Sequence, residues 1–347
     1  EAWVRLMEMA DLRGQSPQQY LDPALAAAKR SLVAAPDASD GHTKEAFAYL
    51  FVTQAMESQL MEPAFLAMTN RLITAGEAAV RLHPDDVYAR DALGNGYINI
   101  AKYKLEHREP YLDFIKMAKE QFSAAISTQV RFPWAYNDLG RAYFVEGDDR
   151  LLRREDPTQP YQAAIKAFTE AVALDGEYQF GYTNLAMTYA SLARHAIEHG
   201  ADPSPYLEKL TASARRTLSL NGKSIDAHLA FVLGYTLRSL YDLESSGDVE
   251  KSAAMAQSYI DKLVKLQQDL PMAYERLGFT YYVLARQHLN QATDPTEALQ
   301  KGLEALGTCD KLRRGQDGLC SSLTAKLLSL QAQQLRLRMT RVLAPDD

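Results

Sequence analysis

The stretch Ala-Tyr-Asn-Asp-Leu-Gly-Arg-Ala-Tyr at Ala135–Tyr143 returns as Ala-Tyr-Glu-Arg-Leu-Gly-Phe-Thr-Tyr at Ala273–Tyr281. Both copies fit Ala-Tyr-x-x-Leu-Gly-x-x-Tyr, and steps of 46 residues from either leucine reach a large apolar residue at every position from 47 to 323. Self-similarity at a fixed period of this size indicates a repeat architecture. The frame residues are Phe47, Leu93, Leu139, Leu185, Phe231, Leu277 and Leu323.

Other columns keep their residue type at the same step. The residue after the frame is mostly small, as in Gly94, Gly140 and Gly278, and the residue four after the frame is usually aromatic, as in Tyr143. Positions three or four apart share one helical face. We therefore expect the small residue to let a neighbouring helix approach closely, while the aromatic fills the space one turn on.

A second helix is expected in each unit. Ala164, Phe168 and Ala171 have helical spacing, and Asp175-Gly176 supplies a helix stop and a turn. Prolines are expected between helices because a proline inside one costs about 3 kcal/mol. No sustained alternation of apolar and polar residues predicts a strand. The sequence predicts an all-α protein of antiparallel helix pairs, in about seven units that bury apolar faces between neighbours.

These motifs together resemble the tetratricopeptide repeat (TPR). The resemblance rests on Leu-Gly-x-x-Tyr in the first helix, Ala-x3-Phe-x2-Ala in the second, and the Asp-Gly or His-Pro stop. It implies a right-handed superhelical α-solenoid, which we expect to form a single domain over residues 1–347. The usual period of the family is about 34 residues. The additional residues, in stretches such as 147–160 and 194–205, are expected to lengthen the helices and the loop within each pair.

In the TPR family the first helices line a concave groove, so the resemblance implies a binding face on columns two before, two after and five after the frame. Asparagine and arginine can hold a peptide backbone or carboxylate, and aromatic residues and methionine supply apolar anchors. A solvated or self-packed surface is the alternative interpretation. The groove candidates are Asn95, Asn137, Arg141, Phe144, Thr183, Met187, Glu275, Phe279 and Tyr282.

The function predicted from this resemblance is a protein- or peptide-binding module with no cofactor and no enzymatic activity of its own. The stretch 201–207, Ala-Asp-Pro-Ser-Pro-Tyr-Leu, is similar to repeat regions attached to some bacterial serine/threonine kinases. This similarity implies the sensing or docking part of a larger signalling protein. The chain itself carries no glycine-rich phosphate loop, His-Arg-Asp or Asp-Phe-Gly motif. It begins at Glu1 without methionine, so we expect a piece of a longer protein.

Composition excludes some partners. The net charge of −6 and the pI near 5.7 do not favour nucleic acid, which requires a basic surface. No apolar run approaches the roughly 18–20 residues of a membrane-spanning helix, so direct membrane insertion is not expected. His195, Glu198 and His199 fit the His-x-x-Glu-His pattern of one zinc peptidase class. A solvated helix end is the preferred interpretation because no third ligand is evident, and we predict no metal site.

Cys309 and Cys320 are the only cysteines. Their columns hold mostly a small and a large residue in other units and flank a turn, so the two side chains should meet across an antiparallel helix pair. Either a disulfide or two buried thiols would fit, and the disulfide is preferred. A disulfide would indicate an oxidising, extracytoplasmic compartment such as the periplasm.

An architectural scaffold is the alternative function, in which the repeats assemble a complex through their ends and edges. The last helix, residues 323–343, stays apolar along one side through Leu327, Leu330 and Leu335. This side allows self-association through the C-terminal helix.

Overall fold

The computed structural model describes residues 6–7, 17–56, 63–313 and 318–343. All regular structure in these ranges is helical, comprising fourteen α-helices and one 3-10 helix, as the sequence predicts. The elements are η1 (Pro17–Tyr20), α2 (Leu21–Ala34), α3 (Ser39–Ala55), α4 (Pro63–Leu82), α5 (Val87–Glu106), α6 (Leu112–Thr128), α7 (Pro133–Leu152), α8 (Thr158–Leu174), α9 (Gln179–Glu198), α10 (Ser204–Leu220), α11 (Ile225–Ser245), α12 (Val249–Leu266), α13 (Pro271–Asn290), α14 (Thr296–Arg313) and α15 (Gly318–Leu343).

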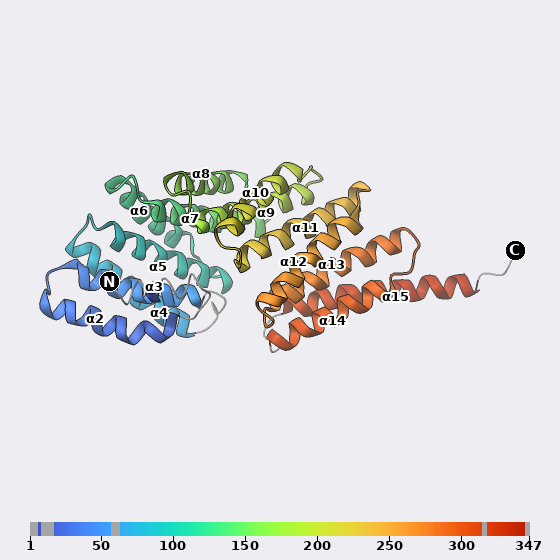
Figure 1. Ribbon diagram of the computed structural model, residues 1–347, viewed down its shortest axis with the longest axis horizontal. Coiled ribbons are helices and arrows are strands. Elements are labelled where there is room, and N and C mark those ends of the chain that lie inside the picture. The colour runs from blue at the N-terminus through green and yellow to red at the C-terminus, as the bar shows by residue number, and fades with distance from the viewer. Residues whose placement is uncertain (1–5, 8–16, 57–62, 314–317, 344–347) are drawn as a thin grey trace. The chain divides into compact units, whose positions relative to one another are not determined.

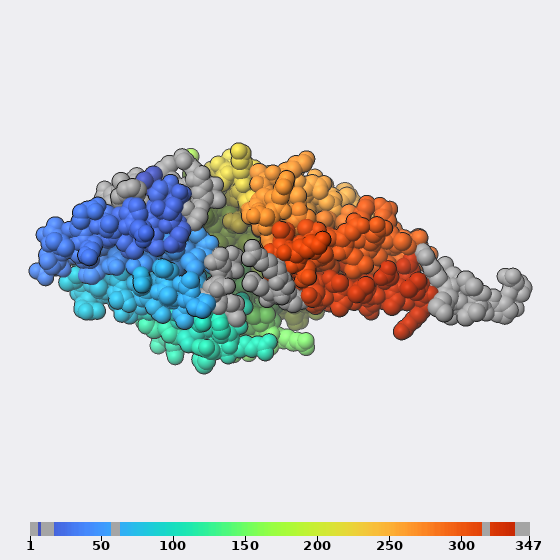
Figure 2. Space-filling view, turned by 90° about the horizontal axis from the view of Figure 1, so that it is seen from below, coloured from blue at the N-terminus to red at the C-terminus, as the bar shows by residue number. Residues whose placement is uncertain are grey.

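The chain divides into two compact units, residues 1–181 and 182–347. Within each unit consecutive helices pack side by side in chain order, as the labels of Figure 1 show. In the space-filling view of Figure 2, the blue helices at the start of unit 1 lie against light-blue α4, and orange lies against red in unit 2. The frame residues lie on the odd-numbered helices α3 to α15, which we call first helices, and the even-numbered helices from α4 on are second helices. This arrangement is an all-α helical-repeat solenoid.

Contacts one repeat apart confirm the 46-residue step. Arg141 Nη1 on α7 donates to Asn95 Oδ1 on α5 at 2.7 Å, and Asn99 Nδ2 on α5 donates to Thr53 Oγ1 on α3 at 3.0 Å. Both pairs join residues 46 positions apart. First helices therefore contact first helices of the next repeat, in addition to their own second helix.

The small residues one position after the frame lie where the two helices of a pair contact each other. A Cβ added at Gly140 on α7 would lie 2.6 Å from the Phe168 ring on α8, and one at Gly94 on α5 would lie 2.5 Å from the Phe122 ring on α6. The close approach is as predicted, but the residue that fills the space is an aromatic of the second helix. Because both rings are fully buried, each glycine–phenylalanine contact holds its helix pair at a short separation.

Capping sets where the first helices of unit 1 begin. Asp86 Oδ1 accepts hydrogen bonds from the backbone N–H groups of Tyr88 and Ala89, which fixes the start of α5. Pro133 opens α7, where a missing N–H costs nothing. The expectation that prolines lie between helices is wrong for five of them. Pro63, Pro133 and Pro271 are the first residues of their helices, and Pro160 and Pro205 lie in the first turns of α8 and α10, where the proline ring fits a helix.

The additional residues of the 46-residue unit mainly lengthen the helices. Helices α5, α7, α9 and α13 each span 20 residues, and Gly147, which we expected near a long loop, lies inside α7. The expected longer loop is short, since only residues 153–157 separate α7 from α8.

At the C-terminal end of unit 2, Cys309 on α14 and Cys320 on α15 are joined as a disulfide, with Cα atoms 6.3 Å apart. Both side chains are fully buried. Among the described residues, no helix is long and apolar enough to cross a membrane.

Candidate functional site

The first helices of unit 1 carry a buried network of polar side chains that joins α5 to α7. Asp138 accepts three hydrogen bonds, from Asn95 Nδ2 at 2.6 Å, Asn137 Nδ2 at 2.9 Å and Arg141 Nη1 at 3.3 Å. Three of the predicted groove residues thus meet around one carboxylate that the prediction did not include. We call Asp91, Asn95, Asn137, Asp138 and Arg141 the polar network.

Arg141 is held in place by this network. Its Nη1 donates to both Asn95 Oδ1 and Asp138 Oδ1, so two helices fix one guanidinium group. Asn95 is fixed in turn, because its Nδ2 also donates to the backbone carbonyl of Asp91. A guanidinium held by charge-assisted hydrogen bonds loses little further freedom on binding a ligand. The network therefore positions Arg141 before any partner arrives.

Asp91 is the member of the network with an unsatisfied carboxylate oxygen. Its side chain is 2% exposed and its Oδ1 has no hydrogen-bond partner. Burial, with a smaller contribution from the negative charge of Asp138, raises the pKa of Asp91 well above its ordinary value. The same two causes, burial first, raise the pKa of Tyr178, which precedes α9. The network thus encloses an ionisable group that is shielded from solvent and has one unpartnered oxygen.

An aromatic patch adjoins the polar network at the start of α5 and α7. The Tyr88 ring lies 5.2 Å from Phe132 and 6.2 Å from Trp134, and Phe47 of α3 lies 6.3 Å from both Tyr88 and Trp134. Phe47 and Phe132 are buried, Trp134 is partly exposed, and Tyr88 is 47% exposed. We call Phe47, Tyr88, Phe132 and Trp134 the aromatic patch. Its buried members support exposed ring surface on the first-helix side of unit 1.

Tyr88 and Trp134 belong to the column five before the frame, which lies on the same helical face as the columns of Asp91, Asn95, Asn137 and Arg141. One face therefore offers exposed aromatic surface beside a positioned, partly exposed guanidinium, with the amides of Asn95 and Asn137 buried beneath it. Aromatic residues and arginine are enriched at the centres of protein interfaces. Such a face suits an extended or helical peptide with an apolar side chain and backbone carbonyls or a carboxylate.

The remaining predicted residues are not part of this assembly. Phe144 packs on the second helix of its own pair, with its ring 5.7 Å from that of Tyr161. In unit 2, Met187 packs against the α9–α11 core, and Thr183 Oγ1 lies 3.4 Å from Thr217 Oγ1.

On α13, Glu275 is buried and forms ion pairs with Arg313 at 3.6 Å and with Arg276 at 3.7 Å. Phe279 and Tyr282 lie 5.9 Å apart and pack against the α13–α15 core. These five unit 2 residues contribute to the packing of their unit and are not gathered at one point.

Asp138, Tyr88 and Trp134 were not among the residues predicted from the sequence. Asp138 lies one residue before the frame, beside the columns predicted to form the groove. The aromatic column five before the frame, with Tyr88, Trp134 and Phe180 in three successive units, was a visible signal. Phe180 remains 36% exposed in the structure.

The His-x-x-Glu-His segment lies at the end of α9. The rings of His195 and His199 are 4.2 Å apart, and His199 Nδ1 lies 2.8 Å from the carbonyl oxygen of His195, so a backbone contact occupies this nitrogen. No cluster of three or more potential metal ligands occurs within the part of the chain that the structure describes.

Comparison with known proteins gives similarities of fold only. No family model and no curated protein matches the sequence. Among solved structures, the chain is similar to TTC0263, a thermophilic TPR protein of Thermus thermophilus, with 18% identity, 68% of this chain and 99% of that chain covered, and a TM-score of 0.44. It is also similar to Pseudomonas aeruginosa PilF (14% identity, 85% and 99% covered, TM-score 0.47) and to yeast Tom70 (15%, 94% and 62%, 0.47). The TPR-like character of the chain rests on its own 46-residue helix pairs.

Proposed function

We propose that the chain is a protein-binding module and that a peptide segment of its partner binds to the first helices of unit 1, over the aromatic patch and the polar network. The observation that carries this proposal is the shared face itself. Exposed Tyr88 and partly exposed Trp134 lie on the same face as Arg141, which two helices hold in place.

The chemistry of the face favours a peptide over a small polar molecule. The aromatic patch offers ring surface that an apolar side chain can cover, and burial of apolar area supplies about 25 cal/mol per Å². Arg141, whose side chain stays partly exposed, adds directional hydrogen bonds that fix the register of a bound chain. An apolar anchor beside a directional contact is the usual anatomy of an interface hot spot.

The test is a peptide-display selection against the intact chain, followed by affinity measurement for the selected peptides with variants at the face. Tyr88→Ala and Trp134→Ala each remove a ring of the aromatic patch that is exposed or partly exposed, and circular dichroism checks that the fold is intact. Leu152→Ala, which truncates a 72% exposed side chain at the end of α7, is the matched control. We expect each ring removal to weaken binding by about tenfold or more, and the control to leave it unchanged. Peptides that bind all three variants with wild-type affinity would refute the proposed face.

An assembly scaffold is the second candidate function, and the exposed side of α15 favours it. Of the side predicted for self-association, Leu327 and Leu330 instead pack in the core of unit 2, whereas Leu335 is 54% exposed, and Leu328, seven residues before it, is 48% exposed. Paired apolar side chains on an end helix can join copies of a solenoid. Light scattering after size-exclusion chromatography tests this function. A dimer that the double variant Leu328→Glu/Leu335→Glu converts to monomer would support it, and a wild-type monomer at high concentration would contradict it.

The wider context of the module is a further proposal. The similarity of residues 201–207 to kinase-attached repeats supports a sensing or docking role within a larger bacterial signalling protein. The Cys309–Cys320 pair supports placement in an oxidising compartment outside the cytoplasm. Secretion of the parent protein with the two thiols oxidised is the result that would support this placement.

A further inference from the structure

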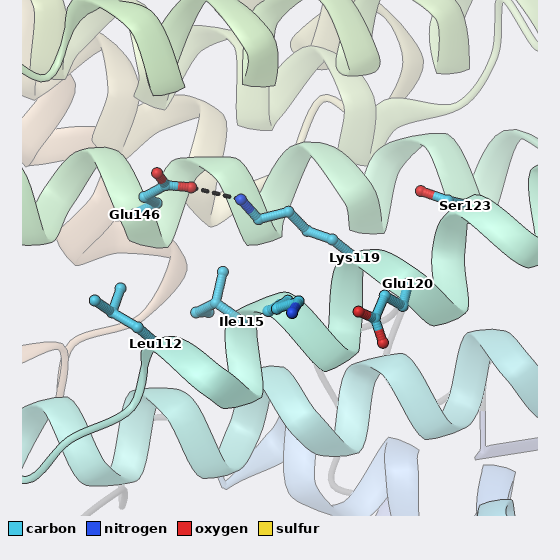
Figure 3. Close-up of a pocket in the computed structure, with 7 residues that line it drawn as sticks. Leu112, Ile115, Lys119, Glu120, Ser123 and Glu146 are labelled. Carbon is cyan, nitrogen blue, oxygen red and sulfur yellow. Dashed lines mark hydrogen bonds and ion pairs between the residues drawn. The ribbon is translucent and has the colours of Figure 1, made fainter.

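The hollows along the second helices do not single out a ligand. Figure 3 shows the first, of about 340 Å³, where Lys119 reaches from α6 to Glu146 on α7 and its Nζ lies 2.5 Å from Oε2. The other charged residues of its lining, Lys116 and Glu120, also balance. The second hollow, of about 540 Å³ along α10, α11 and α12, is lined by three acidic and three basic side chains. A chemically reactive pair of residues lies instead at the end of α10, in the turn to α11.

The sequence contains two Asn-Gly pairs, Asn95-Gly96 and Asn221-Gly222. In such a pair the backbone nitrogen of the glycine can attack the side-chain amide carbon of the asparagine, because glycine has no side chain that blocks the approach. Asparagine is one of the thermolabile residue types. The fold places the two pairs in opposite surroundings, so they should differ in reactivity.

Asn95 and Gly96 lie inside α5, where the helical backbone engages their N–H groups. Asn95 is 1% exposed, and its Nδ2 donates to the carbonyl oxygen of Asp91 at 3.0 Å and to Asp138 Oδ2 at 2.6 Å. The amide is thus held by two acceptors and shielded from water. The fold protects this pair, because neither the Gly96 nitrogen nor the Asn95 amide is free to move.

Asn221 and Gly222 lie in the turn that joins α10 to α11. Asn221 is partly exposed and Gly222 is exposed. Among the described residues, no acceptor receives a hydrogen bond from the backbone N–H of Gly222, and a Cβ added there would meet only the carbonyl oxygen of Leu218, at 3.8 Å. The backbone N–H of Lys223 donates to Asn221 Oδ1 at 3.1 Å, which draws electron density away from the amide carbon. This pair therefore combines an open nucleophile with a polarised amide in contact with water.

We propose that Asn221 is a site of spontaneous deamidation, with water as the second reactant. The Gly222 nitrogen loses its proton to a solvent base and bonds to Asn221 Cγ. The Cγ–Nδ2 bond then breaks, and Nδ2 takes up a proton from solvent and leaves as ammonia. Water opens the resulting cyclic imide at either carbonyl, giving aspartate or isoaspartate at position 221. The site lies in unit 2 and does not depend on the face proposed for unit 1.

The two products should affect the turn differently. Asp175 takes the same place one repeat earlier, where its Oδ1 accepts the backbone N–H two residues on at 2.9 Å. An aspartate at position 221 can therefore keep the contact to Lys223. An isoaspartate adds a methylene group to the backbone between the last hydrogen bond of α10, from Asn221 N–H to the Thr217 carbonyl, and the Ser224 cap of α11. We expect this product to loosen the connection between α10 and α11.

The test is incubation of the intact, folded chain in mildly alkaline buffer made with water enriched in a heavy oxygen isotope, followed by trypsin digestion in ordinary water and mass spectrometry. Cleavage after Arg90, Lys102, Arg216 and Lys223 places the two Asn-Gly pairs in separate peptides, 91–102 and 217–223. Product formed in the folded chain carries heavy oxygen, whereas product formed during digestion carries ordinary oxygen. The same incubation in urea measures both pairs without the fold.

Gly222→Ala is the variant, because a methyl group fits at this open position and hinders the approach of the nitrogen. Circular dichroism checks that this variant is folded. We expect heavy oxygen in the peptide 217–223 of the folded chain at a rate at least about tenfold above that of 91–102, similar rates for both peptides in urea, and a severalfold decrease in Gly222→Ala. Asn221 that reacts only in urea, equal rates for the two peptides in the folded chain, product with ordinary oxygen alone, or a rate unchanged by Gly222→Ala would each overturn the proposal.

Discussion

Replacing Gly140 by alanine tests the packing that defines each helix pair. The added Cβ would lie 2.6 Å from Phe168, where an ordinary contact is 3.4–4 Å, so α7 and α8 must separate or the fully buried ring must move. Overpacking of this kind costs about 1–3 kcal/mol. Alanine regains about 1 kcal/mol through its higher helix propensity. The free energy of unfolding should therefore fall by about 1 kcal/mol.

Gly307→Ala is the matched control, because a Cβ at this position of α14 meets nothing within 4 Å. Only the propensity gain remains, so the same substitution should raise the free energy of unfolding by about 0.5–1 kcal/mol. The two identical chemical changes are thus predicted to have opposite signs. The assay is urea denaturation followed by circular dichroism at the helix band.

Phe168→Ala and Gly140→Ala together form a double-mutant cycle across the helix-pair contact. Phe168→Ala alone should cost about 3–5 kcal/mol through the cavity it leaves. Combined with Gly140→Ala it should cost less than the sum of the two changes, because the added methyl group no longer meets a ring. The double variant copies the natural pair Ala186 and Ala214 one repeat later. Additive effects, or a stabilising Gly140→Ala, would refute this account of the helix-pair contact.

Three further predictions concern the polar network and the disulfide. Burial raises the pKa of Asp91, so the native chain binds this proton more tightly than the unfolded chain, and stability falls as the pH rises from 3.8 to the raised pKa of the native carboxyl group. Asp91→Asn should therefore gain stability relative to wild type as the pH rises, and urea midpoints that show a pH-independent difference would contradict this. Asn95→Ala removes a donor to Asp138 and should cost about 1–3 kcal/mol in urea denaturation, whereas a change within error would argue against the network. Unreduced, denatured protein should show no reactive thiol from Cys309 and Cys320, and reduction should lower the free energy of unfolding by about 2–3 kcal/mol; two reactive thiols would contradict the pairing.

Much of the fold is predictable from the sequence because the repeat supplies several aligned copies of each packing position. Gly140 and Gly94 occupy the same position of two successive repeats, one residue after the frame. Because protein interiors are close-packed, a small residue among large ones indicates that another helix lies close to it. The sequence did not predict which side chain fills the space. That role belongs to Phe168 and Phe122, and it depends on the relative rotation of two helices, which periodicity does not report.

The candidate site was predictable only in part. Asn95, Asn137 and Arg141 lie two residues before or after the frame, so the repeat predicts them on one helical face, and the structure brings them together. The role of Asp138 was not predicted, because this residue lies beside the frame, where a packing residue is expected. Its role depends on hydrogen bonds between two helices. A pattern in one helix does not show whether a polar side chain points to solvent or to a partner 46 residues away.

Trp134 offers the most direct test of the proposed binding face, because it lies in the aromatic patch and the chain contains only two tryptophans. In a Trp3→Phe background, the emission of Trp134 reports on this face alone. Titration with a labelled peptide from the display selection should give a saturable change in Trp134 emission with the same midpoint as the anisotropy of the label. Anisotropy that saturates while Trp134 emission stays constant would show that the peptide binds elsewhere and would contradict the proposed face.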